Sequence, residues 1–189
     1  MLDFKLVSAP PLAGTDHSFE GGRLHAPADF AAVSFALPLG GEKPAATAIK
    51  TAYGVALPDV GRSALSKDGA ARVVRTSPDQ GMILFTHATP DAERHVAAKL
   101  KGKAYTTDQT DVWVALELSG PASRTVLERI CPIDLADQAF PEGAAARTVM
   151  EHLGTLIIRT GNDSFLLMSA SSSALSFLHA IETSIDYAT

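Results

Sequence analysis

Cysteine and aromatic residues are scarce in this sequence. Cys131 is the single cysteine among 189 residues, so no disulfide can form within the chain, and we expect a reducing, cytoplasmic location. Aromatic residues make up 6% of the chain, whereas hydrophobic residues as a whole make up 46%. With 20% charged residues, this composition is typical of a globular protein and excludes an intrinsically disordered one.

Long hydrophobic runs and an excess of positive charge are also missing. There is no unbroken apolar run long enough to span a bilayer as a helix, and no apolar stretch follows a basic N-terminus, so we expect neither a membrane span nor a signal peptide. The net charge is −5, and the only compact basic run is Lys99–Lys103 at the end of a predicted helix. Because nucleic-acid binding needs a sustained basic surface, we exclude nucleic acid as the main partner. The apolar composition instead favours a protein partner that covers one face.

The sequence motifs of several enzyme classes are absent. There is no dinucleotide fingerprint, no P-loop and no nucleophile elbow, and Ser123 lies in the first turn of a predicted helix. No pair of histidines or cysteines has metal-ligand spacing, so we expect no metal site. A lone helical histidine, such as His95 or His179, is more often structural than a ligand. Cys131 ends an apolar helix, where we expect a buried, unreactive thiol.

The regular pattern begins only after the first 43 residues. Residues 1–43 are rich in turn formers, and we expect an irregular arm on the folded body, with one strand within Phe30–Leu39. Residues 44–110 are predicted to form a first unit, with helices near 45–53 and 90–101 around two strands that meet at the turn 77–80. Thr89 is the expected cap of the second helix.

Residues 111–189 are predicted to repeat this order. An alternating strand at 112–118 precedes a helix at 121–130 and a hairpin that turns at 161–163. The last helix, about 172–186, has its apolar face at Ala174, Leu178, Ile181 and Ile185. We therefore expect an α+β fold made of two similar small units, each an antiparallel sheet with helices packed on it.

Two hairpins in the sequence resemble each other. The first reads "VVRTSPDQGMILFT" from Val73, and the second reads "IIRTGNDSFLLMSA" from Ile157. An ancient duplication explains the shared Arg-Thr and Asp, but so does the general likeness of β-hairpins, and both explanations stay open at this point. Arg75 and Arg159 end strands and could bind an anion, although a protein carboxylate or solvent is the more common partner of such arginines.

Motifs of the second half carry a resemblance to a known family. These are "LSGPASRTVL" from Leu118, "CPIDL" from Cys131, "AFPEG" from Ala139 followed by "ART", and "SALSFL" from Ser173. In this order they resemble the gamma-subunit family of heterotetrameric sarcosine oxidases, which are small relatives of the aminomethyltransferase (T-protein) of the glycine cleavage system. The resemblance extends over residues 44–186, with the looser pieces "GVALP" and "SPDQGMIL" in the first half.

This resemblance implies a fold like the folate-binding domain of T-protein and a place in a hetero-oligomeric oxidoreductase. Such an assembly oxidatively demethylates sarcosine to glycine, forms hydrogen peroxide and passes the one-carbon unit to tetrahydrofolate. The alpha subunit, and with it beta and delta subunits, would be the partners. FAD, FMN, NAD and tetrahydrofolate would be bound by those other subunits and not by this chain.

The resemblance also implies that catalytic residues have been lost. T-protein relatives carry a pair of carboxylates just before the strand equivalent to residues 156–160, and Leu153 and Gly154 stand at that place here. Neither can move a proton, so we expect no catalytic residue in this chain. Glu151 would restore a carboxylate if the alignment shifted by one or two residues. Asp134 is the best remaining acid, and its expected role is to cap a helix.

Three hypotheses follow. The first is a non-catalytic gamma subunit that supports the T-protein-like part of the large subunit. The second is a stand-alone aminomethyltransferase-like enzyme or folate-binding protein, which would need a cavity with a carboxylate. The third is a homo-oligomeric scaffold that reuses the fold.

Overall fold

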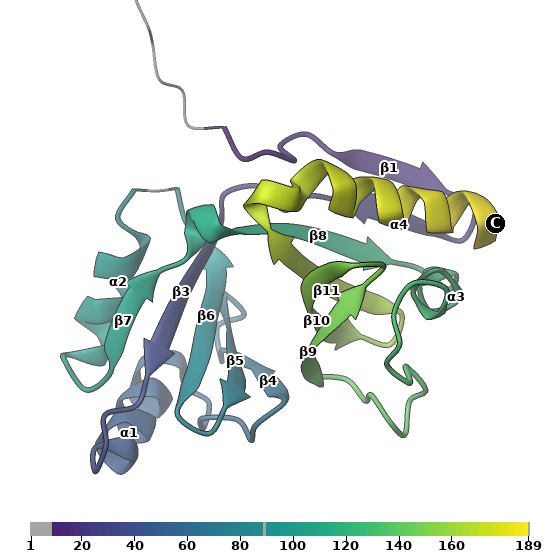
Figure 1. Cartoon of the computed structure of the whole chain (residues 1–189). Coiled ribbons are helices and arrows are strands. Elements are labelled where there is room, and N and C mark those ends of the chain that lie inside the picture. The colour runs from purple at the N-terminus through teal and green to yellow at the C-terminus, as the bar shows by residue number, and fades with distance from the viewer. Residues whose placement is uncertain (1–8, 89, 189) are drawn as a thin grey trace, which may run out of the picture.

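Two antiparallel sheets pack face to face in the computed structural model, which describes residues 9–88 and 90–188 (Figure 1). The five-stranded sheet has, in spatial order, β4 (Arg62–Leu65), β5 (Ala71–Ser77), β6 (Gln80–Thr86), β3 (Phe30–Ala36) and β7 (Tyr105–Asp108). The six-stranded sheet has β1 (Asp16–Phe19), β2 (Gly22–His25), β8 (Trp113–Ser119), β11 (Ser164–Ala170), β10 (Leu153–Gly161) and β9 (Ala145–Met150). The predicted α+β class, with helices packed on antiparallel sheets, is confirmed.

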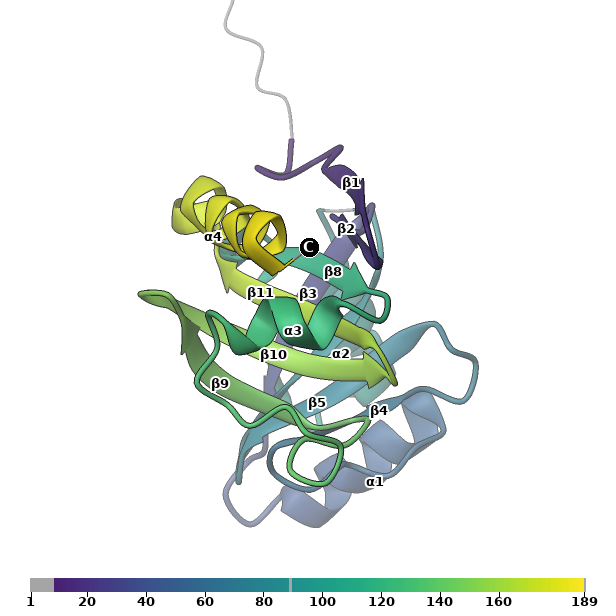
Figure 2. The same ribbon diagram turned by 90° about the vertical axis from the view of Figure 1, so that its right-hand side faces the viewer.

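Helices cover the outer face of each sheet. Helices α1 (Glu42–Tyr53) and α2 (Ala92–Leu100) lie against the five-stranded sheet, and α3 (Ser123–Glu128) and α4 (Ala174–Ala188) lie over the six-stranded sheet (Figure 2). Two short 3-10 turns, η1 (Thr110–Val112) and η2 (Ser171–Ser173), precede β8 and α4. The order of layers is therefore helix, sheet, sheet, helix.

This layering divides the hydrophobic core into three clusters. One lies under α1 and α2, one lies under α3 and α4, and the third lies between the sheets, where Ala32, Met82, Ala115, Leu156 and Met168 meet. On β8 the predicted alternation holds, since Val114, Leu116 and Leu118 face the helices and Ala115 faces the other sheet. No helix in the described part of the chain has the length and apolarity needed to cross a membrane.

The helices begin and end close to the predicted places. Helix α2 begins at Ala92, slightly later than expected. Asp91 is at its N-cap position, but the Asp91 side chain makes no capping hydrogen bond and instead binds His87 Nε2 at 2.7 Å. The predicted cap, Thr89, lies outside the described residues. On α4 the buried face includes Ala174, Ile181 and Ile185 as predicted, but Phe177 and Ser184 take the place given to Leu178, which is only half-buried.

The expectation of an irregular arm at residues 1–43 is wrong for residues 16–25. Strands β1 and β2 form an antiparallel hairpin, and β2 pairs with β8 at the side of the six-stranded sheet. Strand β3, which confirms the strand predicted within Phe30–Leu39, lies inside the five-stranded sheet between β6 and β7. These pairings are long-range and therefore invisible to local composition. The division into units at 44–110 and 111–189 stays a prediction. A boundary at residue 44 would, however, place β3 outside the unit that contains the other four strands of its sheet.

Both halves of the chain repeat one order of elements and one register. The series β3-α1-β4-β5-β6-α2 corresponds to β8-α3-β9-β10-β11-α4, and in each series the second hairpin strand pairs with the first strand. Both hairpins carry an irregularity at the same place, between Arg75 and Ser77 and between Arg159 and Gly161. General likeness among hairpins does not explain matched irregularities and matched strand order, so the structure favours duplication.

The two halves meet through reciprocal backbone contacts at β4 and β9. Ser63 N–H donates to Gly143 O at 2.6 Å, and Ala145 N–H donates to Gly61 O at 2.8 Å. Arg62 forms an isolated antiparallel bridge with Ala144. Equivalent residues thus contact each other in both directions, as in a two-fold symmetric interface.

Tyr53 provides a test of the packing under α1. Its side chain is buried, its hydroxyl has no hydrogen-bond partner in the described structure, and burial raises its pKa from the ordinary 10.0 to about 12. The unfolded chain would lose the Tyr53 proton near pH 10, whereas the folded chain holds it, so stability present below pH 10 is lost as the pH rises towards 12. We expect Tyr53→Phe to weaken this alkaline loss and to raise the free energy of unfolding at pH 7 by about 1 kcal/mol.

Urea unfolding at pH 7 and at several values between pH 9 and 11 measures both effects. Tyr105→Phe is the matched control, because Tyr105 is 70% exposed. Equal behaviour of the two variants, or a less stable Tyr53→Phe at pH 7, would contradict the prediction.

Candidate functional site

Leu153 and Gly154 begin strand β10, where they pair with Met150 and Val149 of β9. Leu153 is half-buried against the cluster under α3 and α4, whereas Gly154 is exposed, with open space where a side chain would stand. Neither position offers a group that could exchange a proton or bind a charged ligand.

Glu151, the alternative acid, lies outside this strand. It is not part of β10 and lies with His152 in the tight turn between β9 and β10, at φ 53. Its side chain is exposed, and its N–H donates to Ile130 O at 3.1 Å. It lines an open cavity of about 580 Å³ together with His179 and Tyr187 of α4. Glu151 is therefore open to solvent and does not extend into the core beneath β10.

The same absence extends beyond this turn. Across residues 9–88 and 90–188, the buried polar or charged side chains are serines, one threonine and one arginine, so no buried Asp or Glu occurs. Asp134, the other acidic candidate, is exposed and accepts the Ala136 N–H at 2.9 Å. It thus closes a local turn and does not cap a helix, because no helix follows it before β9.

Arg75 and Arg159 donate hydrogen bonds to carbonyl oxygens of neighbouring loops, and the two side chains do not line one shared cavity. Arg159 is 2% exposed, and it donates to the backbone oxygens of Phe140, Gly161 and Asn162 at 2.9, 3.2 and 2.5 Å. Its guanidinium also lies 2.7 Å from a carboxylate oxygen of Asp137, and this contact holds the pKa of Asp137 below its usual range.

Arg75 makes the equivalent contacts in the first half of the chain. It donates to Pro58 O at 3.2 Å and to Pro78 O at 2.6 Å. Pro58 and Phe140 precede the reciprocal contact between the halves, and Pro78 and Asn162 lie in the two hairpin turns. The repeated Arg-Thr of the hairpins is therefore explained by architecture, and the alternative of anion binding is wrong for the buried Arg159.

The sequence had drawn attention to Cys131, Ser123 and His95. Cys131 is buried as predicted, and burial raises the pKa of its thiol. Ser123 is buried in α3. His95 is largely exposed and stacks on His87 with ring centroids 5.1 Å apart, and partial desolvation, with the nearby positive charge of Lys99, lowers its pKa. No cluster of three or more potential metal ligands occurs among the described side chains.

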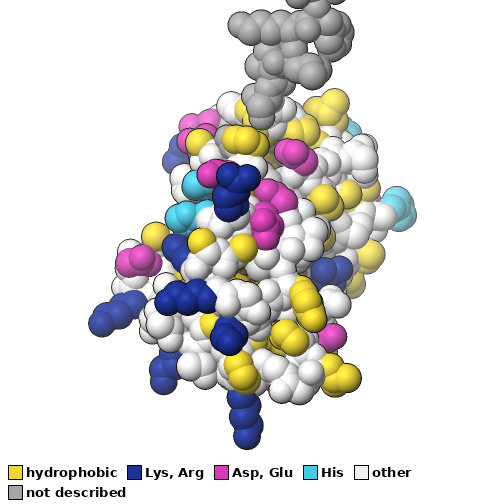
Figure 3. Space-filling model, turned by 90° about the vertical axis from the view of Figure 1, so that its left-hand side faces the viewer, with side chains coloured by type: hydrophobic (Ala, Val, Ile, Leu, Met, Phe, Trp, Pro, Cys, Tyr) yellow, Lys and Arg dark blue, Asp and Glu magenta, His cyan; other side chains and the backbone are white. Residues whose placement is uncertain are grey.

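The face that carries α1, α2 and β7 includes the basic run Lys99–Lys103. Figure 3 shows Lys and Arg side chains standing separately over this face, with hydrophobic and uncharged side chains between them. Lys99 lies over the ring of Tyr53, with Nζ 5.3 Å from its centroid. The positive charges therefore do not merge into a continuous patch here.

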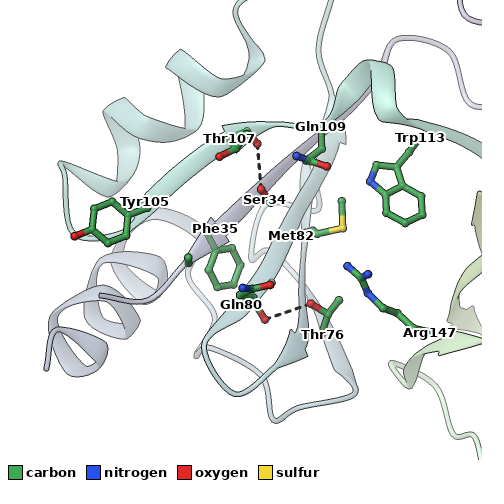
Figure 4. Close-up of a pocket in the computed structure, with 12 residues that line it drawn as sticks. Ser34, Phe35, Thr76, Gln80, Met82, Tyr105, Thr107, Gln109, Trp113 and Arg147 are labelled. Atoms are coloured by element: carbon green, nitrogen blue, oxygen red, sulfur yellow. Dashed lines mark hydrogen bonds between the residues drawn. The ribbon is translucent and has the colours of Figure 1, made fainter. Parts of the chain in front are cut away.

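A cleft of about 310 Å³ opens where the two sheets diverge, and it is a candidate for a functional site because residues of both sheets line it. Its floor is the inner face of β3, β5, β6 and β7, and its far wall comes from the start of β8 and from β9 (Figure 4). Twelve residues line it: Ser34, Phe35, Ala36, Thr76, Gln80, Gly81, Met82, Tyr105, Thr107, Gln109, Trp113 and Arg147. We refer to it below as the intersheet cleft.

Trp113 and Arg147 form the far wall of the intersheet cleft, opposite Met82 and Gln109 (Figure 4). The Arg147 guanidinium lies 5.9 Å from the centroid of the indole ring, within the range of a cation–π contact. Sequence reasoning did not single out these residues as a site. The available signal was their position on strands beside apolar residues that face the other sheet, since Arg147 is the register partner of the buried Leu156.

The order of the elements and the pairing of the strands define the class of fold. The protein has an aminomethyltransferase-like fold, since the glycine cleavage system aminomethyltransferase T from Bartonella henselae superimposes with a TM-score of 0.58 at 17% identity. This match covers 85% of the present chain and 45% of that chain. The heterotetrameric sarcosine oxidase from Corynebacterium sp. U-96, in complex with pyrrole 2-carboxylate, has a chain that superimposes with a TM-score of 0.77 at 22% identity, covering 95% of both chains.

Two named bacterial proteins are similar to this chain in sequence. Proteins named sarcosine oxidase subunit gamma are 33% identical to this chain in Corynebacterium sp. (strain P-1) over 126 residues and in Arthrobacter sp. over 122 residues. These alignments cover 66% and 64% of the present chain, and the chain spans 62% and 60% of the two relatives. No protein-family model matches the chain. The resemblance to the gamma subunit that the sequence motifs predicted is thus confirmed.

Proposed function

We propose that this chain is the gamma subunit of a heterotetrameric sarcosine oxidase, in which it is a non-catalytic component that supports the T-protein-like part of the alpha subunit. The observation that carries the proposal is the chemistry around Leu153 and Gly154. A chain with an aminomethyltransferase-like fold and gamma-subunit relatives has Leu153 and Gly154, and no acid, at the place where the resemblance to T-protein implies a carboxylate pair.

The magnitude of this loss argues against independent catalysis. Removing a general base costs about 10²–10⁴-fold in rate. A substitute would need a carboxylate or histidine in a shielded position, and the described part of the chain buries neither. The exposed Gly154 also provides no side-chain group that could orient tetrahydrofolate at this place.

The chemistry of the assembly is assigned to the other subunits. In this proposal they oxidise sarcosine to glycine with formation of hydrogen peroxide, and they pass the one-carbon unit to tetrahydrofolate. FAD, FMN and NAD belong to the alpha, beta and delta subunits. The single cysteine supports a cytoplasmic location for the complex.

Co-expression with the other subunits of the same organism tests the proposal. We expect an affinity-tagged form of this chain to purify with a flavin-bearing oxidase, and we expect its omission to reduce the yield of intact complex. The purified chain alone should show no sarcosine-dependent peroxide formation. Turnover by the isolated chain would overturn the proposal.

The alternative of a folate-binding protein predicts a different result. Isothermal titration of the isolated chain with tetrahydrofolate would then show micromolar binding. A single species of higher mass in size-exclusion chromatography, without other subunits, would instead support the homo-oligomeric scaffold.

A further inference from the structure

Arg147 is the only charged side chain among the described residues that line the intersheet cleft. Its side chain is exposed, and no carboxylate of the described residues lies within ion-pairing distance of it. The chain as a whole has a net charge of −5. The unpaired cation in the cleft nevertheless attracts an anionic group at short range, although the net negative charge of the chain opposes this.

Trp113, in the same wall of the cleft, has an unsatisfied hydrogen-bond donor. Its indole Nε1 is buried and has no hydrogen-bond partner in the described structure. A buried donor without an acceptor costs about 1–3 kcal/mol, so an acceptor that reaches it is favoured. A carboxylate drawn to Arg147 has several lone pairs, so it can accept from the guanidinium and, once the side chains that cover Nε1 shift aside, from the indole as well.

The rest of the cleft provides hydrogen-bonding groups along several strands. Ser34 Oγ donates to Thr107 O at 3.3 Å, and Thr76 Oγ1 donates to Gln80 O at 3.4 Å (Figure 4). These groups lie across β3, β5, β6 and β7, and β7 is an edge strand of its sheet. A row of polar groups next to a sheet edge suits an extended polypeptide.

We propose that the intersheet cleft receives an acidic side chain from an extended segment of the alpha subunit. The proposal deepens the proposed function and rests on it. Arg147 pairs with the carboxylate, Trp113 Nε1 donates to it, and the polar strand face accommodates the neighbouring backbone. The cleft is accessible to solvent at the exposed Arg147 in its far wall and at the strongly exposed Tyr105 on β7, and this favours a protein segment over an enclosed small ligand.

Charge reversal tests the pairing in the complex. We expect Arg147→Glu to weaken association with the co-expressed subunits about 10- to 100-fold, the loss typical of a truncated charge pair at an interface. Arg94→Glu is the control, because it makes the same charge change on the exposed side of α2, away from the cleft. Thermal unfolding of both isolated variants checks that folding is intact.

A cross-link identifies the occupant. In the assembled complex, Arg147→Lys places an amine where a carbodiimide can join it to an adjacent carboxylate. We expect mass spectrometry to find a peptide that links position 147 to an Asp or Glu of the alpha subunit, whereas Arg94→Lys gives no such link. A link from position 147 to a second copy of this chain would overturn the assignment.

Because the chain has a single tryptophan, its fluorescence can distinguish binding of a small carboxylate from docking of a protein segment. Titration of the isolated chain with acetate and benzoate should leave the fluorescence of Trp113 without a saturable change. Saturable millimolar binding that Arg147→Gln abolishes would replace the docking proposal by a small-carboxylate site. Normal assembly of Arg147→Glu would refute the docking proposal while leaving the gamma-subunit role intact, and failure of the unchanged chain to assemble would refute that role itself.

Discussion

Replacing Arg159 by alanine is expected to lower the free energy of unfolding by about 3–5 kcal/mol, a large part of the stability of a typical domain. The substitution removes a side chain that is 2% exposed and leaves the carbonyl oxygens of Phe140, Gly161 and Asn162 without their donor. It also removes the packing of the guanidinium over Phe165, 5.9 Å from the ring centroid. Denaturant unfolding followed by circular dichroism measures the loss.

Arg75→Ala is the matched control, because Arg75 has the equivalent place in the first half of the chain. It is only half-buried and donates to two carbonyls, so we expect a loss of about 1–2 kcal/mol. Equal losses for the two variants would show that burial does not determine the contribution of this arginine. A loss below that of Arg75→Ala would contradict the structural role given to Arg159.

Gly120→Ala is expected to destabilise the chain by roughly 2–4 kcal/mol. Gly120 has φ 111, which a residue with a Cβ adopts only under strain, and an added Cβ would lie 2.5 Å from Gly21 O and 2.6 Å from Gly22 Cα. Both contacts are with backbone of the β1–β2 hairpin, which cannot move without disturbing its pairing with β8. The motif "SGPAS" therefore marks a close approach of two chain segments.

Gly154→Ala makes the same chemical change where there is room. Beyond its chain neighbours, no atom lies within 4 Å of the place that a Cβ would take, and its φ lies outside the left-handed region, so we expect a change of less than about 0.5 kcal/mol. Thermal or urea unfolding of the two variants side by side gives the comparison. A tolerant Gly120 would show that the β1–β2 hairpin is not held against β8 as described.

The family motifs acquire physical reasons only in the folded chain. Phe140 of "AFPEG" supplies a carbonyl to Arg159, and Gly143 of the same motif accepts the Ser63 N–H across the interface of the two halves. Arg147 of the following "ART" lies in the wall of the intersheet cleft. A sequence comparison detects these residues as a pattern, but it does not show that one stabilises a loop and another faces a cleft.

The sequence by itself determined the local features of this protein. The α+β class and the positions of α1, α2, α4 and the two matching hairpins follow from periodicity, turn chemistry and motif order. These properties depend on residues close together in the chain. The burial of Cys131 was predictable for the same reason, since it follows an apolar helix face.

Only the tertiary structure decided which distant segments meet. The pairing of β2 with β8 and of β3 with β6, the reciprocal contact between the halves, and the meeting of Arg147 with Trp113 join residues far apart in sequence. Local composition cannot encode such pairs, because their free energy comes from burial and hydrogen bonding that exist only once both sheets have formed. For that reason the sequence predicted an arm for the first 43 residues. In the structure, β1 and β2 belong to the six-stranded sheet and β3 belongs to the five-stranded sheet.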